Sequence, residues 1–92
     1  MKVSIEDYGY NEDKGYVKYK ISDLNLDKLK ILNENLNEDT ELKGNNLFLT
    51  MYYDKQFFPF ESEESKVKLE DYVAREEIEM EIFLSSFLED FN

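Results

Sequence analysis

The chain has 92 residues, of which 22 are acidic and 11 are basic, so its formal net charge is −11; this length allows one domain, and we expect residues 1–92 to form it. It contains no cysteine and no histidine, which excludes disulfide scaffolds, cysteine nucleophiles and thiolate metal sites and removes the commonest general base. The negative charge argues against direct binding of nucleic acid, because phosphate recognition needs clustered Lys and Arg side chains.

Residues 1–22 predict a β-hairpin. Apolar and polar side chains alternate over residues 3–5 and again over residues 17–21, as they do in strands with one buried face. Residues 11–15, with the sequence Asn-Glu-Asp-Lys-Gly, separate the two runs and include the Asx and Gly residues that favour a tight connection.

A short helix is predicted over residues 24–34. Ser22 and Asp23 provide a capping hydroxyl and an acid for the first turn, and leucines recur with helical spacing from Leu26 to Leu36. The asparagine-rich run at residues 33–37 is expected to fray the end of this helix.

A second strand pair is predicted from Thr40 to Lys43 and from Asn46 to Tyr53, on either side of Gly44-Asn45. Both faces of the later strand are largely apolar, so we expect it to be the most buried strand. Pro59 then breaks regular structure within residues 54–65.

The last third of the chain predicts a long amphipathic helix over residues 66–90, with Ser65 as its N-cap. Its apolar stripe, interrupted by Glu76, consists of Leu69, Tyr72, Val73, Met80, Phe83, Leu84, Phe87 and Phe91. Residues 78–82 also alternate strictly between apolar and acidic side chains, so a strand is the alternative there. The predicted fold is α+β: a small antiparallel sheet of two β-hairpins, with a short helix and a long acidic C-terminal helix packed on one face.

Most of the negative charge belongs to the C-terminal part of the chain. Residues 1–53 have 10 acids and 7 bases, whereas residues 54–92 have 12 acids and 4 bases. Like charges one turn apart destabilise a helix, and a local cost of this kind is expected where a surface has a function.

We expect the partner-binding surface to combine acids of the long helix with the apolar cluster at residues 57–60. The helical candidates are Glu70, Asp71, Glu77, Glu79 and Glu81, and those at positions 70, 77 and 81 should lie opposite the apolar stripe. The candidates in the preceding segment are Phe58, Phe60, Glu61, Glu63 and Glu64. Carboxylates spaced along a helix approximate the spacing of phosphates, and phenylalanines beside them would act as anchors.

Two alternatives remain for the aromatic residues. The cluster at residues 57–60 would otherwise fold over the core as a lid. The phenylalanines at positions 83, 87 and 91 would either pack on the sheet or seal a homodimer.

The sequence predicts no enzyme, no cofactor and no metal site. Adjacent acids such as Glu70-Asp71 are expected by chance at this composition, and neither a glycine-rich phosphate loop nor a serine nucleophile motif accompanies them. Residues 7–15 superficially suggest a calcium loop but lack its spacing. The single arginine, Arg75, is expected to pair with Asp71 or Glu79, one turn away.

The predicted function is therefore that of a non-catalytic acidic inhibitor. It would bind a basic nucleic-acid-binding protein, such as a nuclease or effector complex, and block its nucleic-acid site by mimicking phosphate charge. Size and charge suggest, by analogy only, a phage or mobile-element anti-defence protein of the anti-CRISPR or anti-restriction type, with a cellular origin as the alternative.

The alternative function is that of an immunity protein, an antitoxin or a small acidic subunit that binds a basic partner. No segment resembles a membrane span or a signal peptide, so the expected location is the cytoplasm, or the host cytoplasm if the protein is phage-encoded.

Overall fold

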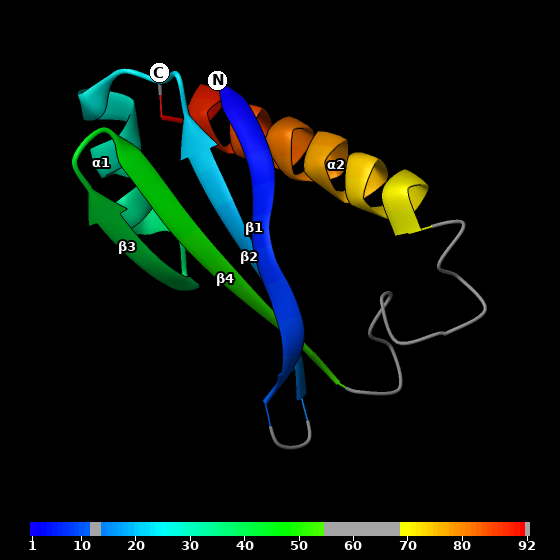
Figure 1. Ribbon diagram of the computed structural model, residues 1–92. Coiled ribbons are helices and arrows are strands. Elements are labelled where there is room, and N and C mark those ends of the chain that lie inside the picture. Colours follow the sequence, from blue (N-terminus) through cyan, green and yellow to red (C-terminus); the bar gives the residue numbers. More distant parts are fainter. Residues whose placement is uncertain (12–13, 55–68, 92) are drawn as a thin grey trace.

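The computed structural model describes residues 1–11, 14–54 and 69–91. Its elements are, in chain order, β1 (Lys2–Asn11), β2 (Lys14–Ser22), α1 (Leu26–Asn35), β3 (Asp39–Lys43), β4 (Asn46–Asp54) and α2 (Leu69–Glu89). The strands form one antiparallel sheet in the order β1-β2-β4-β3 (Figure 1). The predicted α+β fold of two hairpins and two helices is confirmed.

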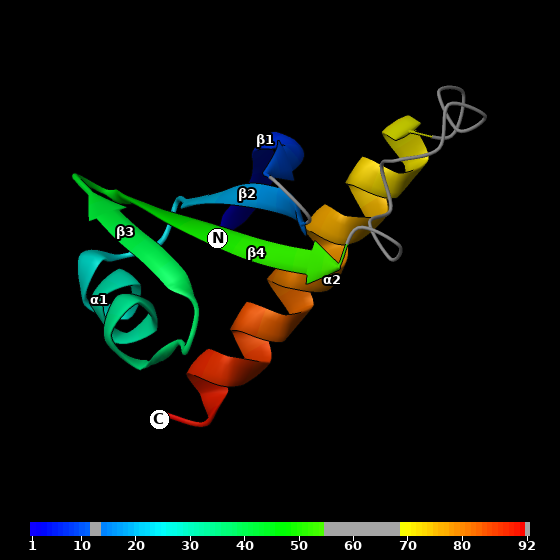
Figure 2. The same ribbon diagram turned by 90° about the horizontal axis from the view of Figure 1, so that it is seen from below.

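The two hairpins join through their second strands, β2 and β4, at the centre of the sheet. The inward residues of these strands lie opposite one another as the pairs Val17–Met51, Tyr19–Leu49 and Ile21–Leu47. Figure 2 shows α1 and α2 on the same side of the strands. Both helices therefore cover one face of the sheet and leave the other face open.

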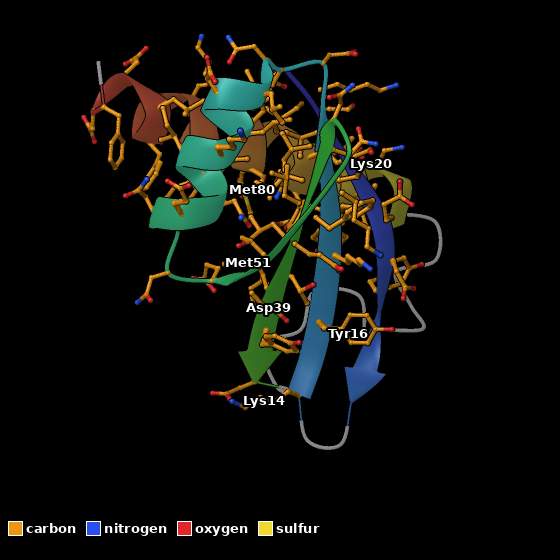
Figure 3. All side chains as sticks on the ribbon, turned by 90° about the vertical axis from the view of Figure 1, so that its left-hand side faces the viewer. Lys14, Tyr16, Lys20, Asp39, Met51 and Met80 are labelled. Carbon is orange, nitrogen blue, oxygen red and sulfur yellow. The ribbon has the colours of Figure 1, made fainter. Side chains whose placement is uncertain are left out.

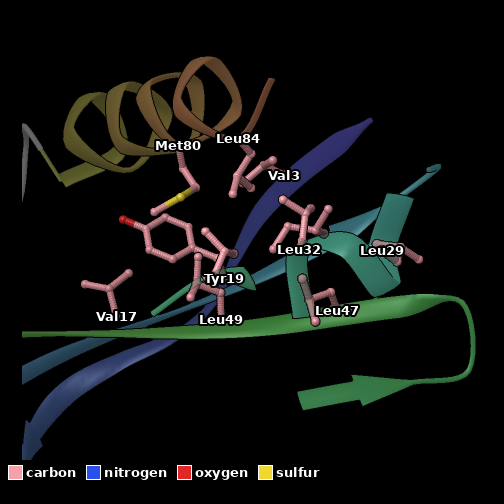
Figure 4. Packing of buried hydrophobic residues seen from close by; sticks show 11 residues of the cluster. Val3, Val17, Tyr19, Leu29, Leu32, Leu47, Leu49, Met80 and Leu84 are labelled. Carbon is pink, nitrogen blue, oxygen red and sulfur yellow. The ribbon is translucent and has the colours of Figure 1, made fainter. Parts of the chain in front are cut away.

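The core lies between the sheet and the two helices. Helix α1 contributes Leu29 and Leu32, and α2 contributes Met80 and Leu84, all of them buried. Figure 4 shows Tyr19 extending from β2 toward Met80. Among the described side chains of α2, those that are fully buried belong to its C-terminal half.

Helix α1 begins later than the sequence predicts. Asn25 is the N-cap residue, and its side chain accepts a hydrogen bond of 2.9 Å from the backbone N–H of Lys28. Asp23 adopts a φ of +55°, in the left-handed region that Asp tolerates better than most residues. Ser22 and Asp23 therefore belong to the end of β2 and the turn that follows it.

The prediction that β4 is the most buried strand is wrong, because buried residues alternate along the whole of β2 but are confined to two positions of β4. Leu47 and Leu49 are fully buried under the helices, whereas Tyr52 is 49% exposed on the open face and Phe48 is partly exposed there. Phe48 and Tyr52 are therefore apolar side chains on an open face of the sheet, and their presence does not indicate that a second layer of helices or strands packs there.

Helix α2 is continuous over residues 69–89, so residues 78–82 are helical and the strand alternative is wrong. It contacts β1, and Figure 1 shows its N-terminal turns extending past the edge of the sheet at this strand. The predicted break at residues 54–65 begins at Asp54, the last residue of β4; the rest of it and the proposed cap at Ser65 lie outside the described residues.

Candidate functional site

The outer surface of α2 is the candidate site. The helix carries seven acids and one base. Because Met80 and Leu84 are buried against the sheet, the helical period divides these acids between an inward and an outward face.

Glu77 lies at the contact between α2 and the sheet, and not opposite the buried face as predicted. Its Oε2 atom accepts a hydrogen bond of 2.8 Å from the backbone N–H of Ile5. Strand β1 is an edge strand, so this carboxylate accepts a hydrogen bond from a backbone N–H that could otherwise pair with a further strand. A bulge follows Ile5, and the N–H of Tyr8 bonds to Oδ1 of Asp7 at 2.9 Å. Acidic side chains thus satisfy two N–H groups of β1.

Glu76 also belongs to the inner contact. Partial burial and the neighbouring charge of Glu79 raise the pKa of Glu76, while Arg75 opposes the shift. Beneath the helix, a hydrogen bond joins the side chains of Tyr19 and Tyr53, and burial raises the pKa of both phenols. Both tyrosines therefore stay protonated at neutral pH.

The outward face of α2 carries an exposed apolar pair. Ile78 and Ile82 are 58% and 62% exposed and lie one turn apart. The exposed acids Glu79 and Glu81 flank this pair on its two sides, and Glu89 continues the same face toward the C-terminus. The result is a hydrophobic strip bordered by carboxylates.

A row of phenylalanine rings follows the inward side of α2 toward the C-terminus. The ring centroids of Phe83 and Phe87 are 6.3 Å apart, and those of Phe87 and Phe91 are 5.1 Å apart. Phe83 and Phe91 are 52% and 48% exposed, so only part of the predicted apolar stripe packs inward.

The structure brings only some of the predicted site residues together. Glu79 and Glu81 are exposed on either side of the isoleucine pair, and Glu77 is at the contact with β1. Glu70 and Asp71 lie in the first turn of α2, but the positions of their side chains are not described. The remaining candidates lie outside the described residues: Phe58, Phe60, Glu61, Glu63 and Glu64.

Sequence reasoning did not single out Ile78 and Ile82. The signal was present, because at 100° per residue positions 78 and 82 lie almost opposite positions 80 and 84. Once residues 78–82 are known to be helical, only one of these two pairs can face the sheet.

The open face of the sheet is a second exposed surface, with its charges matched locally. The four strands carry five lysines and five acids. Lys18 lies 5.2 Å from the centroid of Phe48, and Lys20 is 3.8 Å from Glu6. Figure 3 shows Tyr16 and Lys20 on the side of the strands away from α1. The excess negative charge therefore does not come from the sheet.

Hydroxyl–carboxylate contacts complete this balanced face. Tyr16 donates a hydrogen bond of 3.0 Å to Asp7, and Tyr52 donates one of 3.2 Å to Asp39. The hydrogen bond to Asp7 is the largest cause of the raised pKa of Tyr16. Burial, followed by the hydrogen bond to Asp39, raises the pKa of Tyr52.

Two further findings concern the described ranges. Across residues 1–11, 14–54 and 69–91, no group of three or more Asp and Glu side chains is placed to hold a metal ion. None of the helices in these ranges combines the length and apolarity needed to cross a lipid bilayer.

Comparison with known proteins identifies the family of the chain. No curated protein matches it. A family model described as "Family of unknown function (DUF5750)" matches residues 2–90, a range that includes the whole sheet and both helices. The chain therefore belongs to the DUF5750 family.

Proposed function

We propose that the protein is a non-enzymatic inhibitor that binds a basic nucleic-acid-binding protein through the outward face of α2. The exposed pair of Ile78 and Ile82 between Glu79 and Glu81 is the observation that carries this proposal. Exposed apolar side chains gathered on one face are typical of interaction surfaces. The acids beside them favour a partner whose groove has lysines or arginines along its rim.

The distribution of charge determines the side of the molecule from which a basic partner approaches. Lysines and acids balance on the strands, whereas α2 has seven acids and one base. A basic partner is therefore attracted to the helical side, and this attraction raises the rate of encounter.

The dimensions of α2 support occupation of a nucleic-acid site. A helix of 21 residues is about 31 Å long at 1.5 Å per residue, close to the length of one turn of duplex DNA. Its carboxylates would accept charge-assisted hydrogen bonds from side chains that otherwise hold phosphates. The isoleucines would supply the desolvated contact that slows dissociation.

The natural partner in this proposal is a nuclease or effector complex, and the protein is an anti-defence protein of the anti-CRISPR or anti-restriction type. Its place of action is the cytoplasm, which is the host cytoplasm if a phage encodes the protein. Size and charge support this context by analogy, since folds of this kind serve many functions.

The test begins with capture of basic proteins from a host lysate at low salt, followed by affinity measurements on the purified target. We expect affinity to fall at least ten-fold between 50 and 200 mM salt, as for phosphate-like contacts, and the target's nucleic acid to compete. The triple variant E79Q/E81Q/E89Q should bind more weakly, whereas the control E34Q/E38Q/E41Q should bind like the original protein. Simultaneous binding of the target to this protein and to nucleic acid rules out mimicry.

The exposed isoleucine pair also favours a second candidate, an immunity protein or antitoxin, because tight neutralisation of a toxin needs an apolar anchor as well as charge. A small acidic subunit of a larger assembly belongs to the same class. In these cases the captured partner is a toxin or a subunit, and nucleic acid does not compete for it.

A further inference from the structure

The outward face of α2 has opposite charges at its two ends. Arg75, Ile78, Ile82, Ser86 and Glu89 recur at intervals of three or four residues, so they lie along one line of the helix. All five side chains are exposed. The pattern is therefore positive at one end, apolar in the middle and negative at the other end.

Arg75 has unused capacity for an ion pair. The ion pairs among the described side chains are Lys20–Glu6 and Lys43–Glu41, and Arg75 takes part in neither. Its guanidinium lies 5.9 Å from the ring centroid of Tyr72. Stacking of this kind leaves the N–H donors at the edge of the guanidinium free to bond a carboxylate.

We propose that two copies of the chain form a two-fold dimer in which α2 packs antiparallel against α2 of the partner, with the axis at Ile82. In this register, Arg75 of each copy lies opposite the partner's Glu89. Ile78 lies opposite the partner's Ser86, and the two Ile82 side chains meet at the axis. The same surface serves both copies, as a closed two-fold assembly requires.

The opposite charges at the two ends of this line select the register. With the axis at Ile82, Arg75 lies opposite the partner's Glu89, and Glu89 lies opposite the partner's Arg75. A shift of the axis to Met80 would pair Ile78 with the partner's Ile82 but would place Arg75 opposite the partner's Ser85. Of these two registers, the one with its axis at Ile82 brings opposite charges together at both ends and is therefore preferred.

The position of α2 in the fold permits this contact. The outward face points away from the sheet and forms part of the outer surface of the helical layer (Figure 2). Pairing of two such layers gives an arrangement of sheet, helix, helix and sheet. Ser85 and Ser86 are small, which lets the two helix axes approach to about 8–10 Å.

The dimer and the proposed inhibitor use the same face, so dimerisation would regulate partner binding. This step rests on the proposed function, whereas the dimer itself does not. Each copy has a net charge of −11, so salt strengthens the dimer by screening repulsion between copies. Salt weakens binding to a basic partner, and the two associations therefore respond to salt in opposite directions.

Cysteine cross-linking tests the position of the axis, because the natural chain has no cysteine. Ile82→Cys should form a disulfide-linked dimer under mild oxidation at least ten-fold faster than Glu34→Cys, which places the thiol at an exposed position of α1. Equal rates for the two variants would overturn the proposed interface.

A charge exchange tests the register. In sedimentation equilibrium, Arg75→Glu and Glu89→Arg should each weaken the dimer at least five-fold, and the double variant R75E/E89R should restore most of the loss. A double variant as weak as either single variant contradicts the pairing of Arg75 with the partner's Glu89. A dimer that cross-links at Ile82, in a protein that captures no basic target, leaves this proposal intact and removes the proposed function.

Discussion

At the scale of single residues, the hydrogen bond between Glu77 and Ile5 joins two positions separated by 72 residues. It attaches the C-terminal helix to the N-terminal strand and satisfies one backbone N–H at the free edge of that strand. Glu77→Leu removes the acceptor, whereas Glu77→Gln retains a side-chain oxygen at the same place. We expect the leucine variant to lose about 1 kcal/mol of stability relative to the glutamine variant, since a partly buried N–H is left unpaired.

Urea unfolding of the two variants measures this difference, and hydrogen exchange at the Ile5 amide locates it. Exchange at Ile5 should accelerate in Glu77→Leu and stay slow in Glu77→Gln. Equal stability and equal exchange in both variants would show that the bond to Glu77 contributes nothing.

Glu76 gives the stability a dependence on pH. Its pKa is raised above its ordinary value of 4.5, chiefly by burial, so the folded state penalises its charged form. This penalty is absent at pH values below the pKa that Glu76 has in the unfolded chain. It grows as the pH rises from that value to the pKa of Glu76 in the folded protein, and it is complete at higher pH. Glu76→Gln should therefore stabilise the protein at pH 7, by less than about 1 kcal/mol because water screens a partly exposed group.

The comparison at pH 4 provides the internal control for this prediction. There the original protein and Glu76→Gln should have nearly the same midpoint of urea unfolding. A gain that is as large at pH 4 as at pH 7 would mean that the substitution acts through packing and not through the charge.

The role of Glu77 could not be predicted from the sequence, because it depends on which strand lies at the edge of the sheet. The spacing of acids along α2 gives their angular order but not the position of β1. The N-cap of α1 was missed for a related reason. Ser22, Asp23 and Asn25 are all good caps, and the choice among them depends on where β2 ends.

At the scale of elements, α2 combines a buried and an exposed row of large apolar side chains. Leu84 is 0% exposed and Ile82 is 62% exposed, although they are only two positions apart. Leu84→Ala should cost roughly 2–4 kcal/mol, as expected for a cavity in a packed core. Ile82→Ala should change stability by less than about 0.5 kcal/mol, as at most surface positions.

Urea unfolding of both alanine variants checks this contrast, at protein concentrations low enough to keep the chain monomeric. A cost above about 1 kcal/mol for Ile82→Ala, with that for Leu84→Ala unchanged, would mean that Ile82 is already covered within a single chain.

Four strands and two helices were predictable because hydrophobic periodicity is a local signal. Alternation identified the hairpins, and helical spacing over residues 66–90 outweighed the short alternating run at residues 78–82. The exposure of β4 was not predictable, because Phe48 and Tyr52 read as core residues when the number of covering layers is unknown. In the folded protein they lie on the open face, where Phe48 packs with Lys18 and Lys43.

At the scale of the whole molecule, the sheet is balanced in charge and α2 is not. The last turn of α2 contains no basic residue, although a positive side chain there would stabilise the helix dipole. Glu77 and Glu81 also lie one turn apart with the same charge. The molecule therefore keeps a locally unfavourable arrangement of charge on α2, the helix whose outward face we propose for binding, as expected when a surface is selected for a partner.

Charge reversal on this face should separate stability from binding. The double variant E81K/E89K places one lysine a single turn after Glu77 and a second positive charge in the last turn of the helix. Both changes favour the helix and reduce the net charge. We expect the melting temperature to rise by about 3–6 °C at 10 mM salt, corresponding to about 0.5–1 kcal/mol, while affinity for a basic target falls.

High salt supplies the control, because these gains are electrostatic and screened. At 500 mM salt the difference in melting temperature should shrink to less than half, and E81Q/E89Q should lie between the original protein and the lysine variant at 10 mM. Circular dichroism at low protein concentration measures all three proteins as monomers. If the lysine variant is less stable than the original protein at 10 mM salt, Glu81 and Glu89 stabilise the fold. Their presence is then explained by stability alone, without a binding partner.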